Sequence, residues 1–121
     1  MKIIITESQH KSLVGKLSPT LMRRLTADDF DYIEHKIPSM ARYEPANVSF
    51  ETFVNNVVGY TITEFVTERK GDEIETFIDP DYGEMFYESS FNKVVELYKD
   101  LTPLLIEMYR DKLYEIWKQY N

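Results

Sequence analysis

The sequence predicts a mainly α-helical single domain spanning residues 1–121, a compact bundle of about five helices around a central helix at residues 50–69. Its 121 residues have the length of one domain and are enough to bury a modest core. Apolar residues recur at steps of three and four through most of the chain. No repeat, low-complexity tract or Gly/Ser linker divides it, so we expect one folding unit.

The central helix has the strongest helical pattern in the chain. A broad apolar face is formed by Phe50, Phe53, Val54, Val57, Val58, Ile62, Phe65 and Val66. Ser49 is suited to cap the first turn, while Arg69, Lys70 and Gly71 are typical of a helix end, with the glycine in the left-handed conformation. About twenty residues rise about 30 Å, so we expect this helix to cross the domain.

The segments before it predict one short strand and three helices. Residues 2–6 form a β-branched run, and the capping box of residues 6–9 opens a helix that continues to about Lys16. A Ser-Pro start favours a second, short helix at residues 18–25. A third helix begins after the cap at residues 26–29.

Pro38 is expected to end that third helix, because proline lacks an N–H and clashes with the preceding turn. Residues 38–47, with two prolines and no period, predict a loop.

Residues 73–78 alternate polar and apolar side chains and precede the turn sequence Asp-Pro-Asp-Tyr-Gly. One interpretation is a strand that pairs with residues 2–6 in a small two-stranded ribbon. The other is a continued helix or a loop, and the sequence does not decide between them. Residues 84–88 are aromatic and acidic with no clear period.

The C-terminal third predicts two helices separated at Pro103. Ser90 is suited to cap the first, and the second extends to about Tyr120. Either the helix kinks at the proline, or a new helix starts with Thr102 as its cap. We favour a break or sharp kink.

The net charge of −7 is unevenly distributed. Residues 1–24 sum to +4 and the remainder to −11, and an acidic body argues against a nucleic-acid partner. No apolar run is long enough to cross a membrane, so we expect a cytoplasmic protein with no membrane partner. The chain has no cysteine, which excludes disulfides and thiolate metal sites.

No catalytic residue, cofactor or metal site is predicted. His10 and His35 fit structural or surface roles better than catalytic ones, and no nucleophile elbow, phosphate loop or paired-histidine motif is present. The acids at 79–84 depart from a calcium loop, because the glycine falls one position early and Ser90 replaces the bidentate glutamate. The acids at 28–31 are expected in the first turn of a helix.

Arginines and aromatic residues are the remaining candidates for a contact surface. Guanidinium groups bind carboxylates or phosphates, and an aromatic-rich helix is typical of interfaces. Solvated or internally paired arginines and core aromatics are the competing interpretations. The candidate interface comprises Arg23, Arg24, Tyr109, Tyr114, Trp117 and Tyr120.

The opening KIIITESQHKSLV and the following SPTLMRRL resemble the start of small uncharacterised proteins predicted in marine bacteriophages and metagenomes. The resemblance is close over about the first 25 residues and one of general character beyond them. It implies a phage-encoded protein. It brings no activity and no functional residue.

Three hypotheses for function follow. The first is a non-enzymatic protein-binding protein, acting on a protein partner or by self-association, as a minor virion component or a modulator of a host protein. The second is an acidic nucleic-acid mimic that inhibits a host DNA-binding factor, which requires rows of carboxylates over one face. The third is an enzyme that uses carboxylates and a metal, which the missing motifs disfavour.

Overall fold

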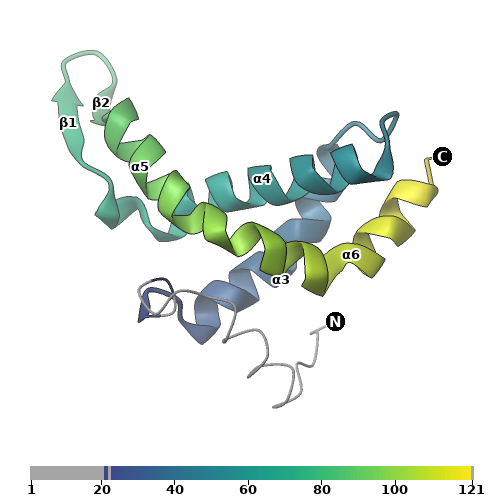
Figure 1. The fold of residues 1–121 in the computed structure, drawn as a ribbon. Helices are drawn as coiled ribbons and strands as arrows, with labels where there is room; N and C mark the ends of the chain where they lie inside the picture. Colours follow the sequence, from purple (N-terminus) through teal and green to yellow (C-terminus); the bar gives the residue numbers. More distant parts are fainter. Residues whose placement is uncertain (1–20, 22, 121) are drawn as a thin grey trace.

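The computed structural model describes residue 21 and residues 23–120 (Figure 1). The predicted elements at residues 2–6 and 6–16, and half of the one at 18–25, lie outside this range. The described elements are, in chain order, α3 (Ala27–Tyr43), α4 (Phe50–Arg69), η1 (Gly71–Glu73), β1 (Thr76–Asp79), β2 (Gly83–Phe86), α5 (Glu88–Tyr98), η2 (Lys99–Leu101) and α6 (Thr102–Lys118).

The prediction of a mainly helical fold with a two-stranded ribbon is confirmed, but the count of about five helices is wrong for the described part. It contains three continuous helical stretches, because α5, the 3-10 turn η2 and α6 follow one another without an extended residue. Figure 1 shows these three stretches crossing one another, with the hairpin at one end.

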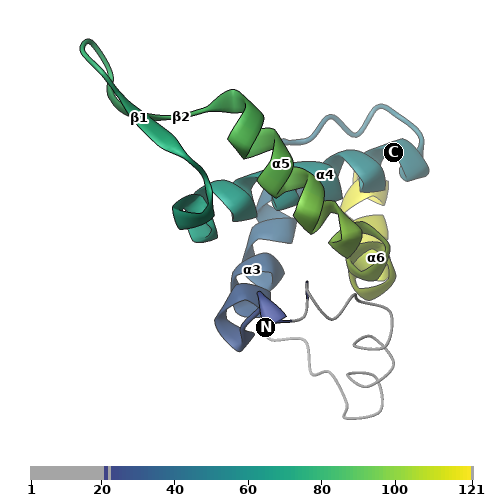
Figure 2. The ribbon, with the colours of Figure 1, turned by 60° about the vertical axis from the view of Figure 1, so that its left-hand side comes forward.

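The central helix α4 has the bounds expected from the sequence. Ser49 Oγ accepts a hydrogen bond from Thr52 N at 3.2 Å and caps the first turn. The helix packs on α3, α5 and α6, and Figure 2 shows α5 crossing it. Its buried side chains are Phe53, Val54, Val57, Val58, Thr61, Ile62, Phe65 and Val66.

The C-terminal end of α4 differs from the expected one. Gly71 is not left-handed, since Gly83 is the only described glycine with positive φ. Instead α4 ends at Lys70, whose N–H donates to the Val66 carbonyl at 3.0 Å, and Gly71 starts the 3-10 turn η1.

The expected end of α3 at Pro38 is wrong. Proline removes one N–H from the helix ladder, but Ile37 before it and Ala41 after it are both buried in the core. Burial of the helix face therefore outweighs the lost bond, and α3 continues to Tyr43. The loop before α4 runs through residues 44–49 rather than 38–47.

The chain bends at the joint between α5 and α6 (Figure 1). One turn of 3-10 helix separates the two helices, and Pro103 lies in the first turn of α6, where a missing N–H is tolerated. Thr102 is already helical, so it does not act as a cap. Buried Leu101 fixes the joint on the core.

The strand interpretation of residues 73–78 is confirmed over Thr76–Asp79, but the partner is β2. The two strands are antiparallel, with Thr76 opposite Phe86 and Asp79 opposite Gly83. Asp79 Oδ1 accepts from the N–H groups of Asp81 at 2.8 Å and Tyr82 at 3.0 Å, and Gly83 has φ +78°. The Asp-Pro-Asp-Tyr-Gly sequence thus closes a hairpin, as a short loop with a left-handed glycine does, rather than simply ending a strand.

Candidate interaction surface

Residues 71–88, which we call the hairpin region, project from the helical body beyond the start of α5 (Figures 1 and 2). Five of the nine exposed large apolar side chains of the described chain lie in these 18 residues: Ile78, Tyr82, Met85, Phe86 and Tyr87. Ile78 is 77% exposed and Tyr82 81% exposed. Apolar side chains gathered on one projecting element indicate a contact surface, whereas scattered ones do not.

The root of the hairpin region is fixed to the body. Ile74 is buried, and the Phe86 ring lies 6.4 Å from that of Phe91 in α5. Glu75 N donates to Ser90 Oγ at 2.9 Å. Ser90 therefore joins the hairpin to α5 and does not cap α5 as expected, because that helix already begins at Glu88 with Tyr87 in the cap position.

The register assigns the side chains of the hairpin to two faces. Opposed residues of antiparallel strands share a face, so Thr76, Ile78, Glu84 and Phe86 lie on one. Phe77 and Met85 lie on the other, where the Phe77 ring lies 4.8 Å from the Tyr87 ring at a tilt of 44°.

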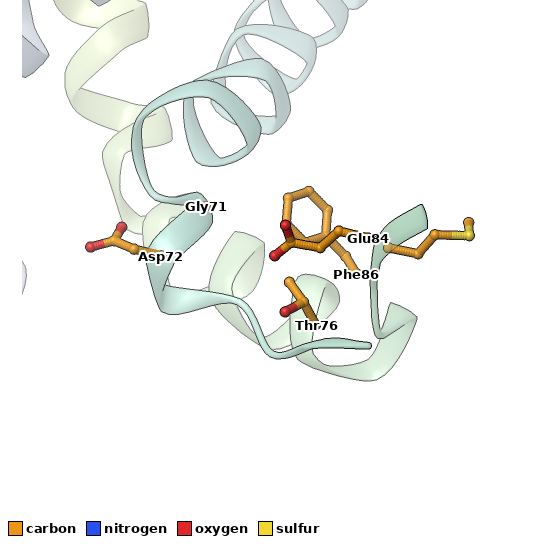
Figure 3. Close-up of a pocket in the computed structure, with 6 residues that line it drawn as sticks. Gly71, Asp72, Thr76, Glu84 and Phe86 are labelled. Atoms are coloured by element: carbon orange, nitrogen blue, oxygen red, sulfur yellow. The ribbon is translucent and has the colours of Figure 1, made fainter. Parts of the chain in front are cut away.

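A hollow of about 580 Å³ lies between η1 and the first of these faces (Figure 3). Gly71 and Asp72 line it from the η1 side, and Thr76, Glu84, Met85 and Phe86 line it from the ribbon. The hollow thus combines two carboxylates with an aromatic ring.

The charge of the hairpin region has one sign. Residues 71–92 include no Lys or Arg, and they include the acids Asp72, Glu73, Glu75, Asp79, Asp81, Glu84 and Glu88. Among the described residues, Glu73 is the only one of these acids in an ion pair, with Arg24. The other six carboxylates therefore have no cation among the described residues to neutralise them.

Asp29, in the helical body, differs from these acids because it is buried and paired with cations. Its side chain is 3% exposed. Oδ1 lies 3.1 Å from Arg69 Nη2, and Oδ2 lies 3.1 Å from Lys70 Nζ and accepts from Thr26 N at 3.0 Å. Burial alone raises the pKa of Asp29, but the Thr26 N–H and the two cations outweigh burial and hold that pKa below its usual value.

Two tyrosines act as hydrogen-bond donors between neighbouring elements. Tyr98 OH donates to Glu73 Oε2 at 2.7 Å, and Tyr32 OH donates to Glu68 Oε2 at 2.6 Å. Burial, reinforced by these carboxylates, raises the pKa of both hydroxyl groups far above its ordinary value. They remain protonated at neutral pH and hold helices together.

The two arginines predicted as contact residues lie at the start of the described chain. Arg23 is exposed. Arg24 pairs with Glu73, and its carbonyl accepts from Lys70 Nζ at 2.6 Å. Arg24 therefore ties the segment before α3 to the root of the hairpin region, in agreement with the internally paired alternative.

The four aromatic candidates, three in α6 and Tyr120 just after it, do not form one surface. Tyr109 is buried in the core. Trp117 is partly buried and donates from Nε1 to the Val48 carbonyl at 3.0 Å. Tyr114 is 46% exposed with its ring 5.3 Å from Phe50, and Tyr120 is 63% exposed. An interface role for Tyr114 and Tyr120 stays a prediction.

Sequence reasoning did not single out the hairpin region. The signal was present, because an uninterrupted run of acids without a cation, interleaved with Phe, Met and Tyr, is unusual in a chain with 29% charged residues. The missing step was the pairing of residues 83–86 with 76–79, which alone shows that these side chains project from the body.

The described residues contain neither a metal-binding cluster nor a helix that could span a membrane. No group of three or more His, Asp or Glu side chains there is placed to hold a metal ion. Within the same range, no helix has the length and apolarity to cross a membrane. Comparisons with protein-family models, curated proteins and solved structures found no match, so function has to be inferred from the chemistry of the surface.

Proposed function

We propose that this is a non-enzymatic protein-binding protein and that the hairpin region is its main contact surface. The observation that carries the proposal is the coincidence of five exposed large apolar side chains with six unpaired carboxylates on one projecting element. Protein contact surfaces combine an apolar centre with a polar rim in this way.

Several charged side chains of the helical body are already paired with one another, which supports the same proposal. Lys36 pairs with Glu68 at 3.4 Å, and Arg110 pairs with Glu51. Arg69 and Lys70 are engaged with Asp29. Charges that already neutralise one another inside a molecule contribute little to binding another, whereas those of the hairpin region remain available.

The resemblance of the first 25 residues to phage proteins extends the proposal to origin. In this view the protein is phage-encoded, and its partner is a host protein met in the host cytoplasm or a component of the virion. The exposed Tyr114 of α6 and Tyr120, just after that helix, form a second, smaller candidate contact.

An acidic nucleic-acid mimic is supported less well. Such a mimic needs rows of unpaired carboxylates over one face. Five acids of the described body, Asp29, Glu51, Glu68, Glu96 and Glu115, are paired with Lys or Arg, and those of the hairpin alternate with exposed apolar side chains that a phosphate mimic does not need.

The test is a photo-reactive amino acid placed at Ile78 and, as a matched control, at Tyr60, an exposed aromatic position on α4. Irradiation in cells of the native host should give discrete cross-linked species from position 78 that are absent from position 60. No adduct at position 78, or the same adducts from both positions, would contradict the proposal.

A further inference from the structure

The outer edge of β1, on the side away from β2, has main-chain groups without a strand partner. Tyr87 N donates to the Glu75 carbonyl at 2.9 Å, which makes these two residues a hydrogen-bonded pair. Bonded and non-bonded pairs alternate along an antiparallel ladder, so Phe77 and Asp79 direct their main-chain groups toward β2. Thr76 and Ile78 therefore direct theirs outward.

Apart from its length of four residues, this edge has few of the features that usually prevent pairing. In the described part of the chain the sheet has only two strands. Edges are commonly protected by a lysine, a proline, a bulge or a covering helix, but β1 reads Thr-Phe-Ile-Asp and its Ile78 is exposed. A short, regular, apolar edge of this kind is suited to accept an added strand.

Charge restricts what can be added. The hairpin region has seven acids and no cation, and six of the acids are unpaired among the described residues. Two copies joined along this edge would bring the two acidic regions together, and like charges oppose such pairing. A segment rich in Lys or Arg would instead neutralise the carboxylates.

The hollow beside the ribbon supplies a place for one such cation. On an added strand, the side chain opposite Thr76 would share the face of Thr76 and Glu84, which borders the hollow. Figure 3 shows the Glu84 carboxylate beside the Phe86 ring, and the Asp72 side chain on the η1 side, directed away from both. A Lys or Arg stem can lie along the ring while its charged head approaches the Glu84 carboxylate.

We propose that the outer edge of β1 binds an extended segment of a partner protein as a third strand, with Lys or Arg on one face of that segment and apolar residues on the other. A cation opposite Thr76 faces Glu84 at the hollow, and the apolar residues extend the face of Phe77 and Met85. This inference rests on the proposed function and specifies the chemistry of the partner.

The experiment titrates the full chain, labelled with ¹⁵N, with the peptide acetyl-Lys-Val-Lys-Val-Lys-Val-amide. Shifts should centre on the amides of Thr76 and Ile78. Replacing every lysine by glutamate, or regrouping the same residues as Lys-Lys-Lys-Val-Val-Val, should abolish them. Equal binding of the glutamate peptide would refute the charge argument, and equal binding of the regrouped peptide would refute the added strand.

Ile78→Pro is the decisive variant, because it removes the outward N–H while the inward N–H groups of Phe77 and Asp79 remain. Loss of about one main-chain bond should weaken binding about tenfold, whereas the control Ile78→Thr keeps the N–H and stays within about twofold. Glu84→Gln should weaken binding about threefold. Unchanged affinity of the proline variant, with the Glu75–Tyr87 bond still protected, would overturn the proposal.

Further measurements distinguish two other possible occupants of the β1 edge. Residues 2–6 are a second predicted strand, so Ile4→Pro should leave peptide affinity unchanged, and about tenfold tighter binding would assign the edge to the chain's own segment. Shifts at Ile78 that depend on protein concentration alone would assign it to a second copy. Cross-linking at position 78 that persists in a protein failing the peptide test would preserve the proposed function and reject only the added strand.

Discussion

Asp29 of α3 meets Arg69 and Lys70 at the end of α4, a contact that we call the α3–α4 junction. The junction and the hairpin region use the same residue types for opposite purposes. At the junction, buried Asp29 is satisfied by Thr26 N, Arg69 and Lys70, and Lys70 Nζ also lies 5.9 Å from the centres of the Phe65 and Tyr98 rings. In the hairpin region, carboxylates and aromatic rings are equally close in sequence but mostly exposed and unpaired. The presence of cations at the junction, and their absence from the hairpin, decides which acids stabilise the fold.

The comparison separates stability from binding. Substitutions at the junction should change the free energy of unfolding, and substitutions in the hairpin region should change contacts with other molecules. The following predictions test this separation, beginning with the largest effect.

Phe65→Ala should destabilise the protein by about 3–5 kcal/mol, because it leaves a cavity in the core and removes the ring packed on Tyr98 and Tyr32. The matched change Ile78→Ala, at an exposed position of the hairpin, should stay within about 0.5 kcal/mol. Urea unfolding of both variants measures the difference. Comparable losses would show that the hairpin belongs to the cooperative core.

Asp29→Asn should cost about 2–4 kcal/mol, because Arg69 and Lys70 lose their buried partner while the side-chain volume is unchanged. Asp28→Asn, at the exposed neighbouring position, is the control and should have little effect. Thermal unfolding monitored by circular dichroism gives both values. If the two variants melt together, the junction does not have the role assigned to it.

Stability should fall at acid pH through Asp29. The folded-state pKa of this carboxyl is depressed, so its contribution is present above its unfolded pKa of about 3.9 and is lost as pH falls through the folded value. The free energy of unfolding of wild type should therefore decrease below about pH 4, and that of Asp29→Asn should decrease less. Parallel pH curves would assign the acid sensitivity to other carboxyls.

Ser90→Ala should cost about 1 kcal/mol, because Glu75 N loses the acceptor that joins the hairpin to α5. The effect should be local, with faster amide hydrogen exchange at residues 75–87 and unchanged exchange at the buried positions of α4. Ser89→Ala, one residue earlier and exposed, is the control. Slower or unchanged exchange in the hairpin would contradict the tether.

The sequence predicted the central helix well because local and long-range terms agree there. The cap at Ser49, the apolar period and the basic end all indicate one helix, and its bounds are those observed. Pro38 shows the opposite case, because the local rule predicts a helix end and the burial of Ile37 and Ala41 overrides it. Burial against another helix cannot be read from the residues near the proline.

The contact surface was harder to predict, since exposure depends on pairing distant in sequence. Nothing local distinguishes core Tyr109 from exposed Tyr114, both on α6, until α3 and α4 are placed. Likewise, Asp29 is a typical first-turn acid until Arg69 and Lys70, forty residues later, are brought to it. The acids of the hairpin were visible as a run, but their role required β2 as the partner of β1.

No residue between Ile74 and Val94 belongs to the buried core. Mutations in that interval therefore meet little resistance from folding, and homologous chains should differ there in length and sequence while the side chains beneath α4 stay apolar. The same helical body could thus acquire new binding specificities through changes confined to this segment.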